Sequence, residues 1–261
     1  GKNELDIPIK LELVPTRTFP FALHQTTGSE KYLKLFNKIM SENDLKVDGY
    51  DIFNSGEKIY FKDEKEIYNK INIQYIPPEL RENKIALEKA QSKQIPKLIE
   101  IRDLKGMIHV HSTWTDGRNT IKEMALKSKE LGFEYMVLCD HSKSAAYANG
   151  LTEERVIKQQ KEIDKLNDED LGIKILKGIE SDILMDGSLD YNDDILKTFD
   201  IVIASIHQGF RLSEEAMTKR IINALENPYT TMLGHPTGRL LTVRPEYELD
   251  IKAIIDCAVD N

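Results

Sequence analysis

Histidine and carboxylate side chains recur in the second part of the sequence, at or just after the ends of short apolar runs. Five of the six histidines lie beyond residue 105. Imidazole nitrogens and carboxylate oxygens together are ligands that suit zinc, manganese or iron. The pattern therefore predicts a metal centre. Its candidate ligands are His109, His111, Asp116, His141, Glu180, His207 and His235.

The spacing of His109 and His111 has a physical reason. On a regular strand, side chains two residues apart point to the same face, so two imidazoles can bind one cation. The two oxygens of Glu180 can bridge two metal ions. Asp140 and Asp182 stand close enough in sequence to orient ligands through hydrogen bonds.

Each candidate also has an ordinary structural interpretation. A single histidine is most often a surface or core residue, and scattered histidines on an acidic surface would have the same composition. Five apolar runs that each deliver such a group favour the metal centre. His24 has no such context and is interpreted as structural. Asp182, Asp186 and Asp190 are either functional or simple turn carboxylates.

Other catalytic chemistries have no matching motif. The sequence contains no GxSxG, no GxxxxGK[ST], no GxGxxG and no EF-hand loop. Cys139 ends an apolar run, which favours a buried, inert thiol. With only Cys139 and Cys257, no disulfide framework is expected, and a reducing cytoplasm is the predicted location.

The elements that must position the candidate ligands alternate in type. Short apolar runs predict strands at 107–110, 135–139, 173–179, 201–206 and 231–233. Amphipathic stretches between them predict helices at 121–131, 153–166 and 214–226. This alternation is typical of parallel βα units in an open sheet or a barrel. In a barrel, the C-terminal ends of the strands converge on one face, where the ligands would meet.

The first part of the chain predicts a smaller mixed domain. We expect a strand at 9–14, a helix within 26–43 capped by Ser29, a hairpin of 50–53 and 58–61, and a short helix at 62–71. Pro77 and Pro78 interrupt regular structure. The predicted domains are residues 1–76 and 105–261, joined by a charged linker at 77–104.

Composition narrows the class of protein. The 261 residues are 40% hydrophobic and 31% charged, enough to build a core. No apolar run reaches the ~20 residues that span a bilayer, and no secretory signal is expected at the N-terminus. Lys and Arg number 36 against 44 Asp and Glu, so the net charge is −8, which argues against a generally basic coat for nucleic acid.

Several stretches resemble the PHP (polymerase and histidinol phosphatase) superfamily. Within residues 104–261 they are GMIHVHSTWTD (106–116), CDHS (139–142), KGIESDIL (177–184), ASIHQGF (204–210) and LGHPTGRLL (233–241). In the first part, FPFALHQTTGSEKY (19–32) and YIPPELRE (75–82) resemble the thumb and connector that precede the PHP domain in bacterial family X DNA polymerases.

The resemblance implies an α/β fold: a distorted (β/α)7 barrel of the PHP type, C-terminally incomplete here, preceded by a small α+β thumb-like domain. It also implies three divalent metal ions. His109 and His111 would hold one ion, which Glu180 bridges to a second. His207 and His235 would hold the second ion, and Asp116 and His141 the third. Glu180 would thus be part of the catalytic site, and Arg239 is either a phosphate contact or a surface salt-bridge partner.

Two departures from the family pattern affect the expected function. The family has an Asp-x-His motif well after the fifth strand, and the printed sequence ends at Asn261 before one, so we expect two strands and two ligands to be missing from it. Lys10 stands where the polymerase palm has its third catalytic carboxylate. Polymerase activity is therefore doubtful.

The leading hypothesis is a metal-dependent phosphoesterase, a 3′–5′ exonuclease of DNA repair that acts on DNA 3′ ends or primer-template DNA. The alternatives are a small-molecule phosphatase of the histidinol-phosphatase type and a non-catalytic DNA-binding module with a degenerate site. Lys31, Lys34 and Lys38 form either a solvated helix face or a contact with DNA phosphates. No membrane partner is expected, and the oligomeric state stays open.

Overall fold

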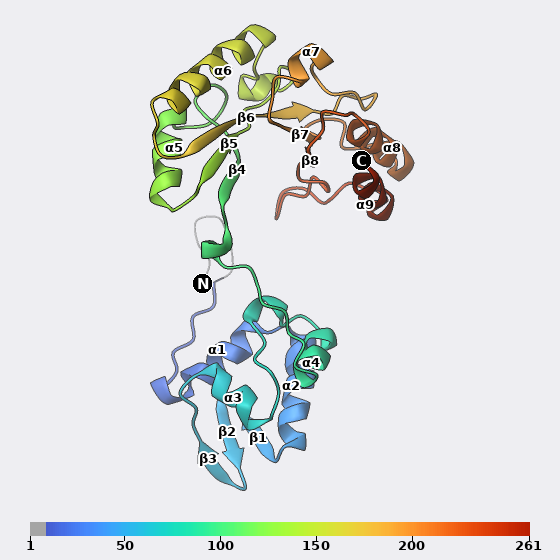
Figure 1. Cartoon of the computed structure of the whole chain (residues 1–261). Coiled ribbons are helices and arrows are strands. Elements are labelled where there is room, and N and C mark those ends of the chain that lie inside the picture. Colours follow the sequence, from blue (N-terminus) through green and yellow to red (C-terminus); the bar gives the residue numbers. More distant parts are fainter. Residues whose placement is uncertain (1–8) are drawn as a thin grey trace. The chain divides into compact units, whose positions relative to one another are not determined.

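The computed structural model in Figure 1 describes residues 9–261. The chain divides between Leu98 and Ile99 into two compact units. Each unit has a hydrophobic core of its own.

The first unit packs helices against a small antiparallel sheet. The sheet has the order β1 (Leu45–Asp48), β2 (Asp51–Asn54) and β3 (Glu57–Ile59). The helices are α1 (Phe19–Thr27), α2 (Glu30–Glu42), α3 (Glu64–Lys70) and α4 (Lys84–Gln91), with short 3-10 turns at Thr16–Thr18 and Pro78–Leu80. Their shared core includes Phe36, Met40, Ile67, Ile76 and Leu87.

Local sequence explains where these elements begin and turn. The Ser29 hydroxyl accepts a hydrogen bond from the Tyr32 N–H at 3.2 Å and caps α2, whose buried face repeats at Tyr32, Phe36 and Met40. Ser55 and Gly56 both adopt positive φ in the two-residue turn between β2 and β3. The expected capped helix, hairpin and short helix are therefore confirmed.

Three expectations for this part of the chain were wrong or incomplete. Residues 9–14 form no strand, because they pair with no other strand of the described chain, and Leu11 and Leu13 are 82% and 90% exposed. The sequence analysis also missed β1 and α1 as separate elements. Within the predicted linker, α4 buries Ala86, Leu87 and Ala90 in the first unit's core, so that stretch belongs to the first unit.

The second unit is built on a parallel five-stranded sheet. Its strands are β4 (Gly106–Val110), β5 (Tyr135–Leu138), β6 (Lys174–Asp182), β7 (Ile201–Ser205) and β8 (Met232–Leu233), and they neighbour one another in chain order. In Figure 1 the sheet curls like part of a barrel. This is the expected α/β arrangement, in which every candidate ligand lies within the last three residues of a strand or follows one.

Helices connect these strands at the predicted places. They are α5 (Ile121–Glu130), α6 (Glu153–Asp168), α7 (Asp193–Leu196), α8 (Glu214–Leu225) and α9 (Ile251–Asp260), with further 3-10 turns at Ile101–Asp103 and Ala146–Ala148. Thr120, Thr152 and Ser213 cap α5, α6 and α8 with their hydroxyl oxygens. The sequence analysis did not anticipate α7 and α9. None of the helices in residues 9–261 is long and apolar enough to cross a membrane.

Candidate metal centre

The carboxylate of Glu180 lies at the centre of a ring of imidazoles. Glu180 is inside β6, one residue beyond the predicted end of that strand, and only 2% exposed. Both of its oxygens face histidine nitrogens. Glu180 Oε1 lies 3.1 Å from His109 Nε2, 3.2 Å from His207 Nε2 and 3.0 Å from His235 Nε2; Oε2 lies 3.0 Å from His141 Nδ1 and 3.5 Å from His111 Nε2.

The parallel sheet explains why residues so distant in sequence meet. Consecutive parallel strands all present their C-terminal ends at one edge. His109 lies in β4 and His111 follows it; His141, His207 and His235 follow β5, β7 and β8. His141 also forms an isolated parallel bridge with Glu180. The structure thus places all five candidate histidines around Glu180, at the end of the sheet where the ligands were expected to meet.

The regular strand assumed for His109 and His111 was wrong. The register between β4 and β5 shifts between Met107 and Val110, and His109 adopts a left-handed φ of 63°. Such a bulge bends a strand and redirects its side chains. Both imidazoles still face Glu180, but the bend brings them there, together with the end of the strand at Val110.

Asp116 forms a second corner of the cluster. Its Oδ1 lies 3.7 Å from His111 Nδ1, and its Oδ2 lies 3.6 Å from His141 Nε2. Its side chain is 50% exposed, whereas that of His141 is 9% exposed. The two imidazoles therefore lie between Glu180 on one side and Asp116 on the other.

The donor atoms fit divalent cations. Three groups place nitrogen or oxygen donors within 4.8 Å of one another: His109, His111 and Glu180; His111, Asp116 and His141; and His141, Glu180 and His207. The buried Nδ1 atoms of His111 and His141 form no hydrogen bond within the described residues, although His141 Nδ1 lies 3.0 Å from Glu180. Unsatisfied imidazole nitrogens that face a carboxylate are what a bound cation would require.

The ionisable groups of the cluster shift one another's pKa values. Burial acts to raise the pKa of Glu180, but contacts with the surrounding imidazoles, beginning with His109, outweigh burial and hold the pKa well below its usual range. Burial acts to lower the pKa of His207, but hydrogen bonds with Asp182 and Glu180 raise it to about 9. Burial and the neighbouring His141 lower the pKa of His111. Glu180 is thus an ionised carboxylate, the form that binds cations.

Of the two carboxylates that were predicted to orient ligands, only Asp182 bonds a candidate ligand directly. Asp182 Oδ1 lies 2.6 Å from His207 Nδ1, as predicted for an orienting group. Asp140 touches no imidazole in this way. It is fully buried and accepts hydrogen bonds from the Ser112 N–H and hydroxyl at 2.8 and 2.6 Å, from the Gln159 amide at 2.7 Å and from the Thr115 hydroxyl. Asp140 therefore orients the turn after His111.

The cluster forms the floor of a cavity of about 520 Å³. Arg239 lines it and is exposed, with its backbone N–H directed to the Thr237 hydroxyl. Arg244 lines it too, but its Nε donates to the Gly238 carbonyl at 2.9 Å and its guanidinium stacks on Phe210 at 3.8 Å. Tyr147 contributes a 70% exposed side chain.

Sequence reasoning missed Tyr147 and Arg244. Tyr147 lies in a loop without a recognisable motif, and it reaches the cavity because the Leu151 N–H donates to the His141 carbonyl at 2.8 Å and so folds the loop back over the strand end. The only signal for Arg244 was its position five residues after Arg239.

The remaining residues singled out by sequence have structural partners. Asp186 accepts hydrogen bonds from Ser188 in an exposed turn, and Asp190 accepts two from Ser144, each at 2.6 Å. Cys139 is fully buried, and burial raises the pKa of its thiol to about 12, as expected for an inert cysteine. His24 is fully buried among aromatic rings of the first unit, which confirms its structural role.

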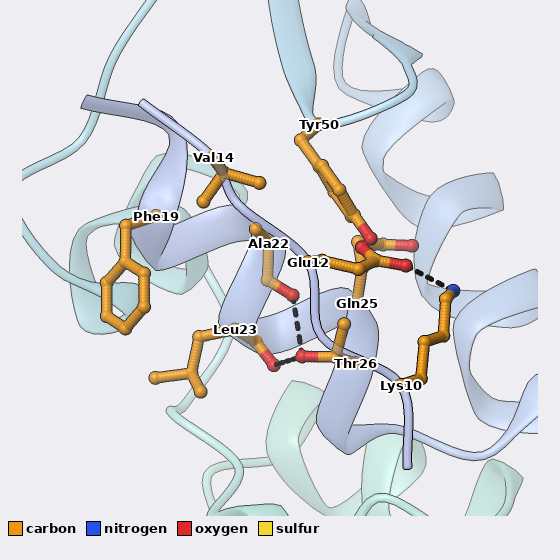
Figure 2. Close-up of a pocket in the computed structure, with 9 residues that line it drawn as sticks. All are labelled: Lys10, Glu12, Val14, Phe19, Ala22, Leu23, Gln25, Thr26 and Tyr50. Atoms are coloured by element: carbon orange, nitrogen blue, oxygen red, sulfur yellow. Dashed lines mark hydrogen bonds and ion pairs between the residues drawn. The ribbon is translucent and has the colours of Figure 1, made fainter. Parts of the chain in front are cut away.

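The first unit has a pocket of different character (Figure 2). This cavity has a volume of about 450 Å³. Its charged lining residues are Lys10 and Glu12, and its other lining residues are apolar or uncharged. Its one carboxylate, Glu12, is ion-paired with Lys10. Within residues 9–261, all three groups of metal-ligating side chains lie in the second unit. The described part of the first unit therefore contains no group of three such side chains with their ligand atoms within 4.8 Å of one another.

Comparison with known families agrees with this division. Residues 22–82 match the DNA polymerase beta thumb, and residues 108–254 match the PHP domain. The second match covers the whole ligand cluster.

Individual relatives combine or separate the two parts. The chain is 42% identical to the DNA polymerase/3′-5′ exonuclease PolX of Bacillus subtilis over 98% of its own length and 45% of the relative's. It is 43% identical over 33% of its length, and 34% of the relative's, to a protein of Caldanaerobacter subterraneus named as a phosphatase. With another so named, from a Thermoanaerobacter species, it shares 35% identity over 54% of each chain.

The chain spans only about a third to a half of each of these relatives. The PHP match accounts for more than half of the chain and includes all five histidines that surround Glu180. The chain belongs to the PHP domain family, and it carries a DNA polymerase beta thumb ahead of its PHP domain.

Proposed function

We propose that this chain is a metal-dependent phosphoesterase that acts as a 3′–5′ exonuclease on DNA, within a repair protein like the family X polymerases. The observation that carries this proposal is the ring of five imidazoles around the buried, ionised Glu180. We place its sheet in a distorted (β/α)7 barrel, and the protein in the cytoplasm.

In this proposal the cluster holds three divalent ions, which are zinc, manganese or iron. His109, His111 and Glu180 would hold the first, Glu180 with His207 and His235 the second, and Asp116 and His141 the third, so that each imidazole would give one nitrogen to one ion. This is the grouping that the resemblance implies, and His207 Nε2 lies 3.2 Å from Glu180 Oε1. His235 Nε2 lies 3.0 Å from the same oxygen. When bound, such ions neutralise phosphoryl charge and make water a nucleophile at neutral pH.

Residues of the chain itself would position the substrate in the cavity. Arg239 is the exposed cation at the cavity and would contact the phosphate. Arg244 is held by Gly238 and Phe210 and would shape the wall. Because Glu180 is buried and ionised, it would stay a ligand and would not transfer a proton.

DNA is favoured over a small phosphate ester by the chain's organisation. The match to the named exonuclease includes the thumb, whereas the matches to the two proteins named as phosphatases cover about half of the chain or less. A metabolite phosphatase has no need of a thumb. A degenerate site that binds no ion would leave the buried Nδ1 atoms of His111 and His141 without a hydrogen-bond partner.

The test is metal uptake and hydrolysis by the purified chain. Metal removal by a chelator, followed by addition of Mn²⁺, Zn²⁺ or Fe²⁺, should abolish and restore shortening of a 5′-labelled DNA strand from its 3′ end. Histidinol phosphate should be hydrolysed much more slowly. Glu180→Gln should lose both metal and activity, whereas Glu226→Gln, an exposed carboxylate at the end of α8, should lose neither.

Three results would contradict the proposal. The first is a chain that takes up no divalent ion under any of these conditions. The second is shortening of DNA by the Glu180→Gln variant, which would place the chemistry elsewhere, and the third is faster hydrolysis of histidinol phosphate than of DNA, which would give the chain another substrate.

A further inference from the structure

Arg220 is a buried cation that the proposed chemistry does not use. It lies on α8 and is only 2% exposed. All of its recorded hydrogen bonds go to backbone carbonyls. Nε donates to Leu184 O at 2.8 Å, Nη1 donates to Gln208 O at 2.9 Å, and Nη2 donates to Ile183 O.

No carboxylate oxygen of residues 9–261 lies within 4.0 Å of the Arg220 guanidinium nitrogens, although Tyr247, Asp182 and Asp186 are near enough to act on it electrostatically. Burying a cation without an ion pair is costly, and an apolar side chain would fill the same space at lower cost. Packing alone therefore does not explain an arginine here. The planar guanidinium can instead bind several carbonyls in one fixed geometry.

The three carbonyls belong to the two segments that carry His207 and its partner. Ile183 and Leu184 directly follow Asp182, and Gln208 directly follows His207. Asp182 and His207 are themselves joined at 2.6 Å. Arg220 thus hydrogen-bonds to the segments at the C-terminal ends of β6 and β7, the same two segments that the Asp182–His207 hydrogen bond joins at the cavity.

The chain beyond Gln208 is shaped to allow this contact. Gly209 has a φ of +71°, and a Cβ there would lie 2.7 Å from Met185 Sδ and 2.8 Å from Arg220 Nη1. A side chain would be strained at this φ and would push the guanidinium away. The glycine therefore lets the backbone pass close to the cation.

We propose that Arg220 is a positioning residue, which sets the spacing of the β6 and β7 ends so that Asp182 binds His207 Nδ1 and turns His207 Nε2 toward Glu180. The proposal rests on the proposed function only where it treats His207 as a metal ligand. Arg220 itself touches neither substrate nor metal-ligating atoms.

The first test uses the metal-free chain and needs no activity. In ¹⁵N-labelled protein, the His207 Nδ1–H bonded to Asp182 should give a downfield proton resonance, assigned by its loss in His207→Gln. Arg220→Ala should remove or broaden this resonance, and added guanidinium ion should restore it. Arg220→Lys should restore little, because an ammonium cannot reach three carbonyls at once.

Arg155 provides the matched control. It lies on α6 and also binds three backbone carbonyls, those of Asn149, Gly150 and Trp114, but none at the β6 or β7 ends. Arg155→Ala should lower stability and leave the His207 resonance in place. If Arg220→Ala does not fold, Arg220→Lys decides: an unchanged His207 resonance in that variant would overturn the proposal.

The second test measures metal affinity by titration with Mn²⁺. Loss of a group that orients a ligand lowers affinity by about 10- to 100-fold. We expect a loss of that size in Arg220→Lys, with partial recovery in Arg220→Ala plus guanidinium. Normal metal binding with an intact His207 resonance in both variants would refute the positioning role. A His207 resonance that depends on Arg220, in a chain that binds no metal, would uphold it and refute only the proposed function.

Discussion

At the residue scale, the orientation of one imidazole depends on a single carboxylate. Asp182 Oδ1 lies 2.6 Å from His207 Nδ1, and His207 Nε2 lies 3.2 Å from Glu180 Oε1. A carboxylate that accepts the Nδ1–H of a histidine fixes its tautomer and leaves Nε2 to face a cation. Asp182 is buried at 2% exposure, so water does not compete for this hydrogen bond.

We therefore predict that Asp182→Asn lowers the affinity for Mn²⁺ by about 10- to 100-fold, because the neutral amide holds His207 less firmly. Titration of the metal-free chain measures the change. Asp186→Asn is the matched control, since Asp186 is an exposed carboxylate four residues away that bonds only its own turn. Equal affinities for the two variants would show that Asp182 does not orient a ligand.

His24 makes the first unit sensitive to acid. Its Nε2 lies 3.0 Å from the Tyr68 hydroxyl and 3.3 Å from that of Tyr32. Burial, with a smaller contribution from the charge of Arg81, lowers the pKa of His24 to about 3, from 6.5 in an exposed histidine. Between these values the unfolded chain binds a proton that the folded chain does not, so stability is complete above pH 6.5 and is lost as the pH falls toward 3.

We predict that the free energy of local unfolding of α1, the helix that carries His24, falls by up to about 1.4 kcal/mol per pH unit below pH 6 through this one group. Amide hydrogen exchange, corrected for the intrinsic rate at each pH, measures it. His24→Gln should be less stable at pH 7 but should show a shallower decline. Parallel declines in the two proteins would assign the acid sensitivity to other groups.

At the element scale, a buried carboxylate after β5 fixes the turn after β4 by hydrogen bonds. Asp140, at the end of β5, accepts hydrogen bonds from Ser112, Thr115 and Gln159. This turn carries Asp116, and the strand before it carries the bulge at His109. A buried carboxylate with several donors is strongly stabilising because each donor would otherwise be unsatisfied.

We predict that Asp140→Ala costs about 3 kcal/mol or more of unfolding free energy, from the loss of charge-assisted hydrogen bonds and the donors left unsatisfied. Chemical denaturation followed by the fluorescence of Trp114, the single tryptophan, reports on this turn. Asp190→Ala, which removes two hydrogen bonds from the Ser144 loop, provides a comparison of similar chemistry. A smaller loss in Asp140→Ala than in Asp190→Ala would show that the turn does not depend on Asp140.

At the scale of the whole molecule, chemistry and DNA contact are expected to reside in different units. The three groups of metal-ligating side chains found in residues 9–261 are all in the second unit. Lys31, Lys34 and Lys38 are exposed along α2 in the first, and among the residues that the structure describes only Lys38 of the three has an ion-pair partner, Glu42 at 3.8 Å. Lysines that contact phosphates add affinity that does not depend on sequence and that weakens with salt.

We predict that replacing Lys31, Lys34 and Lys38 together with Ala weakens binding to primer-template DNA. The slope of log affinity against log salt should fall by up to about 2.7, while hydrolysis of a small phosphodiester is unchanged. The control replaces three exposed lysines of the same unit, Lys84, Lys89 and Lys93. If both triple variants bind DNA alike, the α2 lysines form only a solvated face.

The sequence by itself determined the ligand types and the order of the elements. The apolar runs and amphipathic stretches of the second unit predicted its five strands and the helices α5, α6 and α8 to within three residues at each end, because local periodicity follows burial on one face. It also placed Ser29 at the start of α2 and Asp182 beside a ligand.

Only the tertiary structure decided how those residues meet. The bulge at His109 depends on pairing with β5, the contacts of Arg220 depend on α8 lying against the ends of β6 and β7, and Tyr147 and Arg244 reach the cavity through loops. Residues 9–14 alternate like a strand yet are not part of one in the structure, because alternation shows which way side chains point and not whether another strand lies alongside. Such contacts join residues far apart in the chain, and no local pattern encodes them.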